Sequence, residues 1–526
     1  MAKGKDIVIG IDLGTRYAQL AVDLSGMGVQ PIPNRWGFTR TPSMVAFSDG
    51  GLIAGEDAAR LSLTDPRSAW WDMKRHLGTD WVARVGGRTY TPEELLIPLL
   101  SLLREDAEAH LRTFISSCVL AVPAHFSFPE RGALARAAQS AGFEKVRIVN
   151  EPTAAALSVG TDSRFLILDF GAGTLDISVV EGENGVFQVV ESKGRQDIGG
   201  YDIDKLLAEW LCKRAGIQFT RVSDPRGSLM MHEAEEVKTA LSNARGVTWR
   251  VPVGLSQTES SADVTRDEFE ALIKPLLNEI IGMVERMWKK HEPEKLLIVG
   301  GSSRIPMLRE MLAKRVGKPE RLKTSPDDAV VIGAAIYANQ GSERLLIDVL
   351  SRSLGVMNDD GGVVQIMNRG TPLPAEAKRR FTASGSGSLE VTIVQGEGRV
   401  KTLNRVLQTV YVDNVQNGEV VDIFFRVDGG GLLHVEVKRK KKTSRQTISL
   451  DSDQSGVIPC DLITELSVRE ERIARLSMSF PDNFQQRLGI LISNAKSLKE
   501  DDNSLQWQAV ELIDKMIAEI EQVVSP

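Results

Sequence analysis

Residues 165–174 read FLILDFGAGT and decide the fold. Apolar residues in the pattern of a strand run into a glycine-rich turn that begins with Asp169 and ends with Thr174. Residues 175–180 then alternate apolar and polar side chains, as a returning strand does. The stretch therefore predicts one strand–turn–strand unit.

The same unit occurs near the start of the chain. Residues 7–15 read IVIGIDLGT, in which an apolar run leads through Asp12 to Thr15. A second apolar stretch follows at residues 18–24, at hairpin distance. Because one supersecondary unit occurs twice, the sequence predicts two related lobes.

Helical periodicity fills the intervals between and after these units. Apolar residues recur at helical spacing over Pro92–Leu111, Arg131–Ala141, His232–Asn243 and Phe269–Lys290. A third glycine turn, GGSSR at 300–304, follows the strand pattern of 295–299, and Pro306 fits the first turn of the next helix. Residues 1–341 therefore predict an α/β domain.

The pattern changes after residue 341. The short apolar segment LLIDV at 345–349 lies between polar residues, so we interpret 342–350 as an interdomain linker. Short alternating runs separated by Gly, Asp and Asn predict an all-β domain over 351–460. Helical spacing returns within 461–526 and predicts a short helical subdomain.

Composition restricts the class of protein and its partners. The 526 residues exceed what one core supports, so we expect about three domains. A net charge of −6 disfavours binding to nucleic acid. The three cysteines, Cys118, Cys212 and Cys460, lie far apart without a CxxC pair, which argues against a zinc motif or a disulfide framework. The sequence shows neither a bilayer-length apolar run nor a signal-peptide pattern, so we expect no membrane partner and a cytoplasmic location.

The two glycine turns have the chemistry of a polyphosphate site. Backbone N–H groups in such turns bind phosphate, and two facing turns can clamp one polyphosphate between them. Asp12 and Asp169 would meet beside the clamp, where carboxylates hold Mg²⁺ through its waters. Thr15 and Thr174 could donate hydrogen bonds to the terminal phosphate as its charge develops.

With these motifs in place, the chain resembles the seventy-kilodalton heat-shock chaperones of the DnaK type, as a divergent member. The segments that carry the resemblance run in family order and are GIDLGT at 10–15, MKRHLG at 73–78, AVPAHF at 121–126, RIVNEPTAAAL at 147–157, LDFGAGTLDIS at 168–178, IGGYDID at 198–204, VGGSSRIP at 299–306 and SPDDAVVIGAA at 325–335. The glycine turns are shared by all actin-like ATPases, whereas NEPTAAAL and the LLID linker are diagnostic of the chaperones. The resemblance implies a multidomain protein with an actin-like two-lobed ATPase domain at 1–341, the linker at 342–350, a β-sandwich peptide-binding domain at 351–460 and a short lid at 461–526.

The resemblance also implies the roles of individual residues. Lys74 and Glu151 would flank the γ-phosphate, with Lys74 positioning or polarising the attacking water. The implied catalytic residues are Asp12, Lys74, Glu151, Asp169 and Thr174, and Asp176 would join Asp12 and Asp169 in holding Mg²⁺ through waters. The implied nucleotide-binding residues are Gly14, Thr15, Arg16, Gly171, Ala172, Gly173, Gly199, Gly200, Glu235, Lys238, Ser242, Gly300, Gly301, Ser302, Arg304 and Asp327.

A second set of implied residues couples the domains or binds peptide. The coupling set is Pro123, Arg131, Arg147 and the linker residues Leu345, Leu346, Ile347 and Asp348. Among these, Arg147 and Asp348 match positions where J-domain cochaperones act. Leu389 would form the central peptide pocket, with Ala383 near the arch above it.

Two departures from the family lie in the phosphate turns. Arg16 replaces a threonine, and its guanidinium could bind phosphate and lower the hydrolysis barrier, tighten nucleotide binding and slow release, or face solvent. Ala172 replaces a glycine, and if the position needs a positive φ the methyl group costs about 1–2 kcal/mol. Both predict slowed or altered turnover.

Other departures concern the peptide-binding half. The second arch position falls in the acidic segment 358–360, which would change the peptides that fit. The helical tail is short for a lid, which predicts fast peptide exchange.

Three further features have simpler interpretations. We interpret the basic run 438–442 as the tip of a hairpin, Trp70 and Trp71 as core residues, and His125 as a packed or hydrogen-bonded imidazole.

The sequence thus predicts an ATP-dependent chaperone that hydrolyses Mg-ATP and binds or releases unfolded apolar segments according to its nucleotide state. A J-domain cochaperone and a nucleotide-exchange factor are the expected partners. One alternative is a nucleotide-binding scaffold or exchange-factor-like relative with little hydrolytic cycling. Another is an actin-like small-molecule kinase or filament, which the linker and the β domain argue against.

Overall fold

The computed structural model describes residues 7–449 except 25–26, 161, 184–185, 196, 221, 223, 253–260, 323, 340–344, 348, 358–361, 399–403 and 440–445. For 186, 345–347 and 446–449 it describes the backbone alone. Contacts divide the chain into two compact units. The first comprises Met1–Ala375, Val394–Leu407 and Val427–Leu432, and the second Glu376–Ile393, Gln408–Arg426 and Leu433–Pro526.

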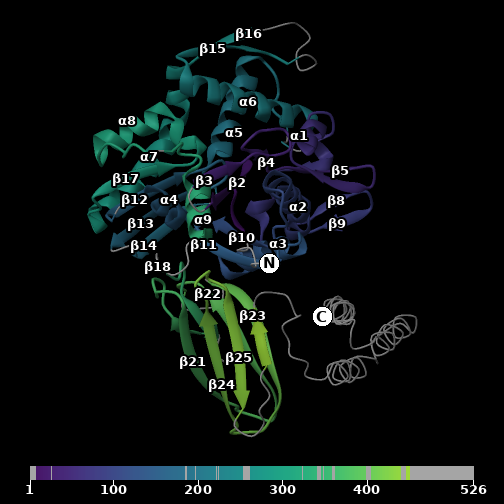
Figure 1. The fold of residues 1–526 in the computed structure, drawn as a ribbon, viewed down its shortest axis with the longest axis vertical. Helices are drawn as coiled ribbons and strands as arrows, with labels where there is room; N and C mark the ends of the chain where they lie inside the picture. The colour runs from purple at the N-terminus through teal and green to yellow at the C-terminus, as the bar shows by residue number, and fades with distance from the viewer. Residues whose placement is uncertain are drawn as a thin grey trace. The chain divides into compact units, whose positions relative to one another are not determined.

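One sheet of the first unit contains the N-terminal strand–turn–strand repeat (Figure 1). Its strands are β1 (Val8–Leu13), β2 (Tyr17–Leu24), β3 (Gly28–Ile32), β4 (Thr41–Pro42), β10 (Ser117–Val122) and β11 (Lys145–Asn150). Their order is β11-β10-β1-β2-β3, with β4 also paired to β2. β1 runs antiparallel to β2 and parallel to β10.

A second sheet contains the other repeat. Its strands are β12 (Arg164–Phe170), β13 (Leu175–Glu183), β14 (Val186–Arg195), β17 (Lys295–Val299) and β18 (Leu345–Ile347), in the order β17-β12-β13-β14-β18. β12 runs antiparallel to β13 and parallel to β17, as β1 does to β2 and β10. The common topology confirms the two related lobes.

Nine helices of the described chain lie between and around these sheets. They are α1 (Glu56–Ser62), α2 (Pro92–Leu111), α3 (Phe128–Ser140), α4 (Glu151–Val159), α5 (Gly200–Arg214), α6 (Pro225–Asn243), α7 (Arg266–His291), α8 (Pro306–Arg315) and α9 (Ala329–Asn339). All four predicted helices are confirmed. α2 and α7 begin at capping boxes made by Thr91 with Glu94 and by Thr265 with Glu268, and α6 begins earlier than predicted because Pro225 fits its first turn.

Short elements complete the first unit. β5 (Val45–Ser48), β6 (Gly51–Ala54) and β7 (Ala69–Trp70) form one small sheet, and β8 (Ala83–Val85) with β9 (Arg88–Tyr90) and β15 (Gly246–Arg250) with β16 (Ser261–Thr265) form hairpins. Three 3₁₀ helices are η1 (Pro66–Ser68), η2 (Met73–His76) and η3 (Gly301–Arg304). η3 lies directly before α8, as the GGSSR motif predicts.

The chain beyond residue 350 is all-β where the structure describes it. The strands are β19 (Leu354–Met357), β20 (Val363–Met367), β21 (Ala375–Thr382), β22 (Gly387–Gln395), β23 (Arg405–Val415), β24 (Val420–Val427), β25 (Leu433–Arg439) and β26 (Gln446–Ser449). They form two four-stranded sheets, β20-β19-β22-β23 and β21-β24-β25-β26. Along β24 buried residues alternate with more exposed ones, which confirms the half-buried strand pattern.

Several predictions fall outside the described residues. These are the helical subdomain at 461–526, the acidic segment 358–360, Asp348 and Cys460. β25 and β26 pair antiparallel on either side of the basic run, whose tip is also outside the described residues. Cys118 and Cys212 are buried and free, as predicted. None of the described helices has the length and apolar character needed to cross a membrane.

Candidate functional site

The two glycine turns meet, as the repeat predicts. Asp12 lies near the end of β1 and Asp169 near the end of β12. A Cβ placed on Gly173 would lie 2.5 Å from the hydroxyl oxygen of Thr15, so the second turn passes directly against the first. A glycine is needed at Gly173 because of this close approach.

A buried ion pair lies beside the turns. The Lys74 ammonium donates to the Glu151 carboxylate at 2.8 Å, and the two side chains are 7% and 8% exposed. Lys74 belongs to η2, and Glu151 begins α4. Burial opposes the charge of Lys74, but Glu151 and Asp12 outweigh it and raise the pKa of the lysine.

The neighbouring carboxyl groups lack sufficient compensating charge. Burial, followed by the charge of Glu151, raises the pKa of Asp12 to about 7. Burial and the charges of Glu151 and Asp176 raise the pKa of Asp169 well above its ordinary value, and Lys74 only partly offsets this. Such a group of buried carboxylates favours a cation.

Mg²⁺ fits this donor set when it is held through waters. Oxygen ligands and retained water are what Mg²⁺ prefers, and one carboxylate oxygen of Asp176 is buried without a hydrogen-bond partner. Within the described ranges, no three acidic, histidine or cysteine side chains converge closely enough to ligate a metal directly.

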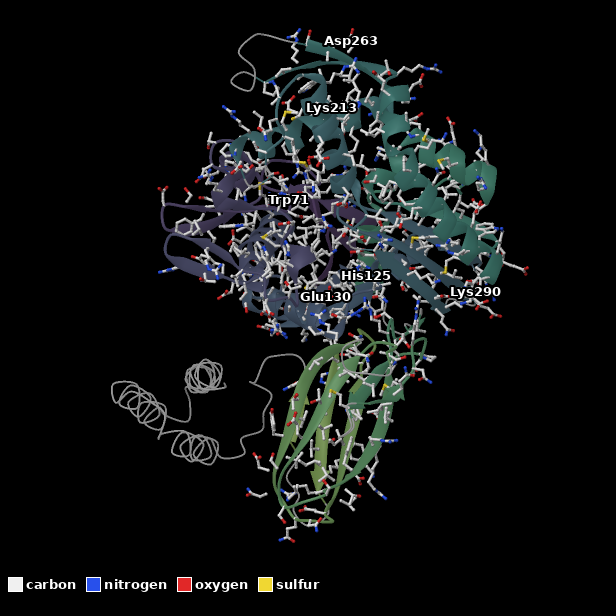
Figure 2. All side chains as sticks on the ribbon, turned by 180° about the vertical axis from the view of Figure 1, so that it is seen from behind. Trp71, His125, Glu130, Lys213, Asp263 and Lys290 are labelled. Atoms are coloured by element: carbon white, nitrogen blue, oxygen red, sulfur yellow. The ribbon has the colours of Figure 1, made fainter. Side chains whose placement is uncertain are left out.

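His125 (labelled in Figure 2) is hydrogen-bonded, as predicted, and its partner is Asp176. The imidazole Nδ1 lies 2.8 Å from the carboxylate Oδ1. Burial opposes protonation, but Asp176 outweighs this effect and raises the pKa of His125. The imidazole therefore orients Asp176 toward the turns.

The third glycine turn joins the first two. Gly300 has φ +83°, and a Cβ there would lie 2.7 Å from the Asp169 carboxylate. The Ser302 hydroxyl donates to the Gly171 carbonyl at 2.8 Å. The same carbonyl accepts the Gly200 N–H at 3.0 Å, which places the start of α5 at the site.

The predicted nucleotide-binding residues on α6 and around the third turn also converge. Lys238 on α6 donates to the Gly200 carbonyl at 3.3 Å, and the Ser242 hydroxyl bonds back to the Lys238 carbonyl. Arg304 pairs with Asp327, and a Cβ on Gly301 would lie 3.4 Å from an Asp327 oxygen. Gly14 and Thr174 lie in the first and second turns, where the Thr174 carbonyl accepts the Gly171 N–H at 3.1 Å, and Gly199 is the N-cap residue of α5.

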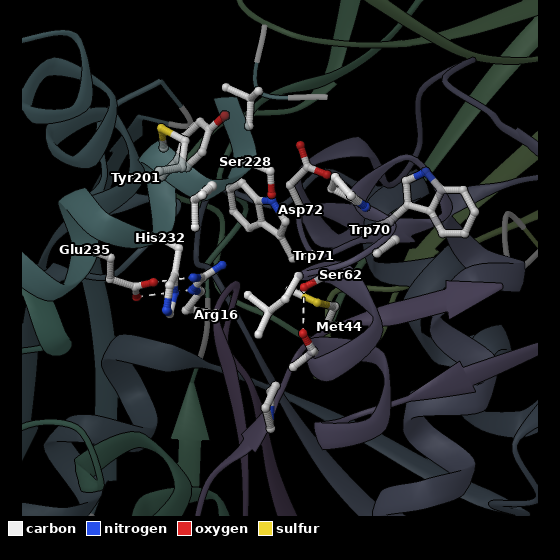
Figure 3. Close-up of a pocket in the computed structure, with 18 of the residues that line it drawn as sticks. Arg16, Met44, Ser62, Trp70, Trp71, Asp72, Tyr201, Ser228, His232 and Glu235 are labelled. Carbon is white, nitrogen blue, oxygen red and sulfur yellow. Dashed lines mark hydrogen bonds and ion pairs between the residues drawn. The ribbon is translucent and has the colours of Figure 1, made fainter. Parts of the chain in front are cut away.

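Arg16 does not simply face solvent, which was one of its three predicted alternatives, and the two alternatives that involve phosphate or nucleotide stay predictions. Its guanidinium is held by both carboxylate oxygens of Glu235 on α6, with Nε 3.1 Å from Oε1 (Figure 3). Its side chain also lies over the ring of Trp71, 5.6 Å from the ring centre. Arg16 therefore links the first turn to the opposite lobe.

Ala172 does not have the positive φ on which the expected strain depends. The described residues other than glycine that have a positive φ are Asp49, Arg112, Glu292 and Asn414, and Ala172 is not among them. The Ala172 carbonyl accepts the Tyr201 N–H at 2.8 Å. Its methyl group therefore carries no left-handed strain.

Sequence reasoning missed several partners of the predicted residues. Asp204 binds the Lys238 ammonium at 2.7 Å, and Arg40 donates to Asp327 at 2.7 Å. Gln19 donates to Asp328, the neighbour of Asp327, at 2.7 Å. Arg40 and Asp327 are far apart in the chain, so no local pattern could have identified the pair.

The predicted coupling residues are held by hydrogen bonds to the backbone and to Asn150. Arg131 donates to the Phe126 carbonyl at 3.1 Å and to the Asn150 side chain at 2.6 Å, next to Glu151. The Phe126 N–H in turn donates to the Pro123 carbonyl. Arg147 donates to the Ala338 carbonyl on α9 at 2.9 Å. The linker residues Leu345–Ile347 form β18, whose backbone pairs parallel to β14.

The two predicted peptide-binding residues differ in accessibility. Leu389 on β22 is half-buried. Ala383 is 3% exposed, so its methyl group is covered in the structure, and its N–H donates to the Glu419 carbonyl.

The core prediction holds for Trp70, which packs against a hydrophobic core of the first unit, but not for Trp71. Both are partly exposed and line a cavity of about 720 Å³, which also borders Arg16 and Ala172 (Figure 3). The Trp71 ring lies 4.5 Å from that of Tyr201 on α5.

The paired lobes with a shared phosphate clamp define an ATP-binding class of protein, and comparisons with known proteins agree. The model of the family described as "Hsp70 protein" matches residues 8–85 and 81–525. The chain is 32% identical over 474 residues to the chaperone protein DnaK of Mycoplasmopsis synoviae (strain 53), which covers 85% of this chain and 79% of that protein.

The chain belongs to the Hsp70 family. It is therefore an ATP-binding molecular chaperone, and its relatives are ATPases that act in protein folding. The family also accounts for an actin-like ATPase domain followed by a β sandwich.

Proposed function

We propose that this chaperone hydrolyses Mg-ATP between its two lobes and uses the nucleotide state to control its grip on extended apolar polypeptide segments. The observation that carries the proposal is the buried Lys74–Glu151 pair beside Asp12 and Asp169, where the two glycine turns meet. Such a site combines phosphate-binding amides, a fixed cation and carboxylates for a metal.

Hydrolysis would rest on positioning and electrostatics. Mg²⁺, held through waters by Asp12, Asp169 and Asp176, would neutralise charge on the phosphates. Lys74, fixed by Glu151, would orient the attacking water, and Thr174 would donate to the terminal phosphate. His125 would keep Asp176 turned toward the metal waters.

The adenosine would lie between α6 and the third turn. Glu235, Lys238 and Ser242 would form one wall, and Gly301, Ser302, Arg304 and Asp327 the other. Two of these residues are already tied to partners, Glu235 to Arg16 and Lys238 to Asp204, which supports a preorganised wall.

We assign residues 1–341 to the ATPase domain, 342–350 to the linker, 351–460 to the peptide-binding domain and 461–526 to the lid. The strand pairing of β18 with β14 supports a linker that docks on the second lobe's sheet. Changes in lobe closure would alter this docking and thereby the grip on peptide at Leu389. Unfolded polypeptides are the proposed clients, with a J-domain cochaperone and an exchange factor as partners.

Single-turnover hydrolysis of Mg-ATP by the full chain tests the proposal. We expect turnover in the wild-type chain and a loss of at least a hundredfold in both Lys74→Ala and Thr174→Ala. Wild-type chain that binds Mg-ATP without turning it over would instead identify a nucleotide-binding scaffold. The absence of left-handed strain at Ala172 removes one argument for that alternative.

A further inference from the structure

A large cavity opens beside the candidate nucleotide site. It has a volume of about 720 Å³, within the range of small-molecule sites, and lies wholly within the first unit. One wall comes from residues 59–72 with Trp81, and the other from α5 and α6 (Figure 3). The cavity therefore lies between the two lobes.

Aromatic side chains from both walls face this cavity. Trp70, Trp71 and Trp81 come from one wall and Tyr201 from the other, and all four are only partly buried. The centres of the Trp71 and Tyr201 rings lie 4.5 Å apart, at an interplanar angle of 49°. The Trp81 ring stacks on the His76 ring, with the ring centres 4.5 Å apart and an interplanar angle of 7°. Partly exposed tryptophans leave large apolar areas in water, which a flat ring in the cavity would cover.

The cavity also carries excess negative charge. Six carboxylates line it, Glu56, Asp72, Asp204, Asp224, Glu235 and Glu236, against three arginines. Glu235 is paired with Arg16, Asp224 lies 3.7 Å from Arg67, and Asp204 is paired with Lys238 outside the lining. Asp72 lies 3.2 Å from His76, and after burial it contributes to raising the pKa of Tyr201 to about 12. The remaining charge disfavours phosphate and favours a cation.

The cavity is distinct from the phosphate site. Its lining does not include Asp12, Lys74, Glu151, Asp169 or the third glycine turn. Arg16, Ala172 and Glu235 border it and belong to the proposed nucleotide-binding set. These residues therefore form the wall that a ligand in the cavity and a bound nucleotide would share.

We propose that this cavity is a second ligand site, which binds a planar aromatic cation against the contacting rings of Trp71 and Tyr201. The rings stack on the ligand, Asp72 and Glu236 compensate its charge, and its size is that of a small metabolite or cofactor rather than a peptide. Only the relation of the site to nucleotide rests on the proposed function, since binding to the cavity itself does not require nucleotide.

Titration of the full chain with 10-methylacridinium tests the site, with acridine-9-carboxylate as the planar anion control. Calorimetry with excess Mg-ADP should give one acridinium per chain and at least tenfold weaker binding of the anion. Equal affinities for the two probes, or no binding of acridinium, would overturn the proposal.

Substitutions locate the bound probe. Tyr201→Leu and Trp71→Leu remove a ring but keep apolar volume, and each should weaken acridinium about tenfold, which corresponds to about 1.4 kcal/mol. Trp210→Leu, also on α5 but outside the cavity lining, is the matched control and should bind as the wild-type chain does. If all three variants bound acridinium with the same affinity, the assignment of the probe to the Trp71 and Tyr201 rings would be contradicted. Thermal unfolding of each variant checks that it is folded.

Competition separates the two sites. Acridinium should bind with and without Mg-ADP, whereas displacement of one molecule by the other in simple competition would place the probe in the nucleotide site and overturn a second site. If the chain fails to bind Mg-ADP but binds acridinium at Tyr201, the proposed function fails and the cavity site stands.

Discussion

At the scale of single residues, Lys74 is the cation that a buried group of carboxyl groups requires. Its ammonium contacts Glu151, and both side chains are almost fully covered. Removal of one member of such a pair leaves the other uncompensated in a poorly solvated place, whereas removal of both leaves no such charge. The ion pair is thus expected to affect stability as well as turnover.

Lys74→Ala should lower the free energy of unfolding by about 3 kcal/mol, measured by urea denaturation at pH 7. The matched double variant, Lys74→Met with Glu151→Gln, should recover most of that stability without recovering hydrolysis. If Lys74→Ala were as stable as the wild-type chain, the Lys74–Glu151 ion pair would not be buried as described.

Ala172→Gly tests the second phosphate turn. Because Ala172 has no positive φ, the substitution relieves no left-handed strain, and we expect the single-turnover rate to stay within about twofold of wild type. A tenfold faster rate in the glycine variant would contradict this conclusion.

At the scale of elements, the site depends on two turns that touch. Gly173→Ala would place a methyl group against the Thr15 hydroxyl at the contact between the lobes. We expect about tenfold weaker binding of Mg-ATP, measured by calorimetry. Gly171→Ala adds the same methyl group to the same turn, where the nearest atom is the Thr174 carbonyl oxygen at 3.6 Å, so its loss should be clearly smaller. Equal losses of Mg-ATP affinity in the two variants would indicate that crowding against Thr15 does not cause the weaker binding.

β14 is joined to the end of α7 through Glu191. Its carboxylate contacts Lys290 at 2.6 Å and His291 at 2.5 Å. Burial opposes the ionised form, but the hydrogen bonds from Lys290 and His291 outweigh it and lower the pKa of Glu191 to about 2. Since the folded pKa lies below the unfolded value, the stabilisation is complete above about pH 4.5 and is lost as the pH falls toward 2.

Glu191→Gln should therefore destabilise the chain by about 1 kcal/mol at pH 7, and the difference from wild type should shrink between pH 4.5 and 2. Urea unfolding at several pH values measures both. A difference that is the same at pH 7 and pH 3 would exclude this ion pair as its source.

The elements were largely predictable from local patterns, and the contacts between them were not. α2 and β17 have the predicted bounds because periodicity and turn residues act over a few positions. Arg16 and Glu235 are 219 positions apart, so the pair appears only when the lobes are folded. The place of Trp71 at a cavity could not be predicted, since apolar residues at a cavity and in a core share one pattern.

At the scale of the whole molecule, the proposed function requires that an ATP site in the first unit be coupled to peptide binding by the β strands. The linker strand β18, paired with β14, is the part of the chain through which this coupling would act. A chaperone of this kind needs differential contacts with ATP and ADP, because a ligand shifts an equilibrium only by its difference in affinity.

The most direct test is the release of a fluorescent apolar peptide from the full chain after rapid mixing with Mg-ATP or with Mg-ADP. We expect Mg-ATP to accelerate release at least tenfold over Mg-ADP. Release at the same rate with both nucleotides would contradict the central claim that nucleotide state controls the grip on peptide.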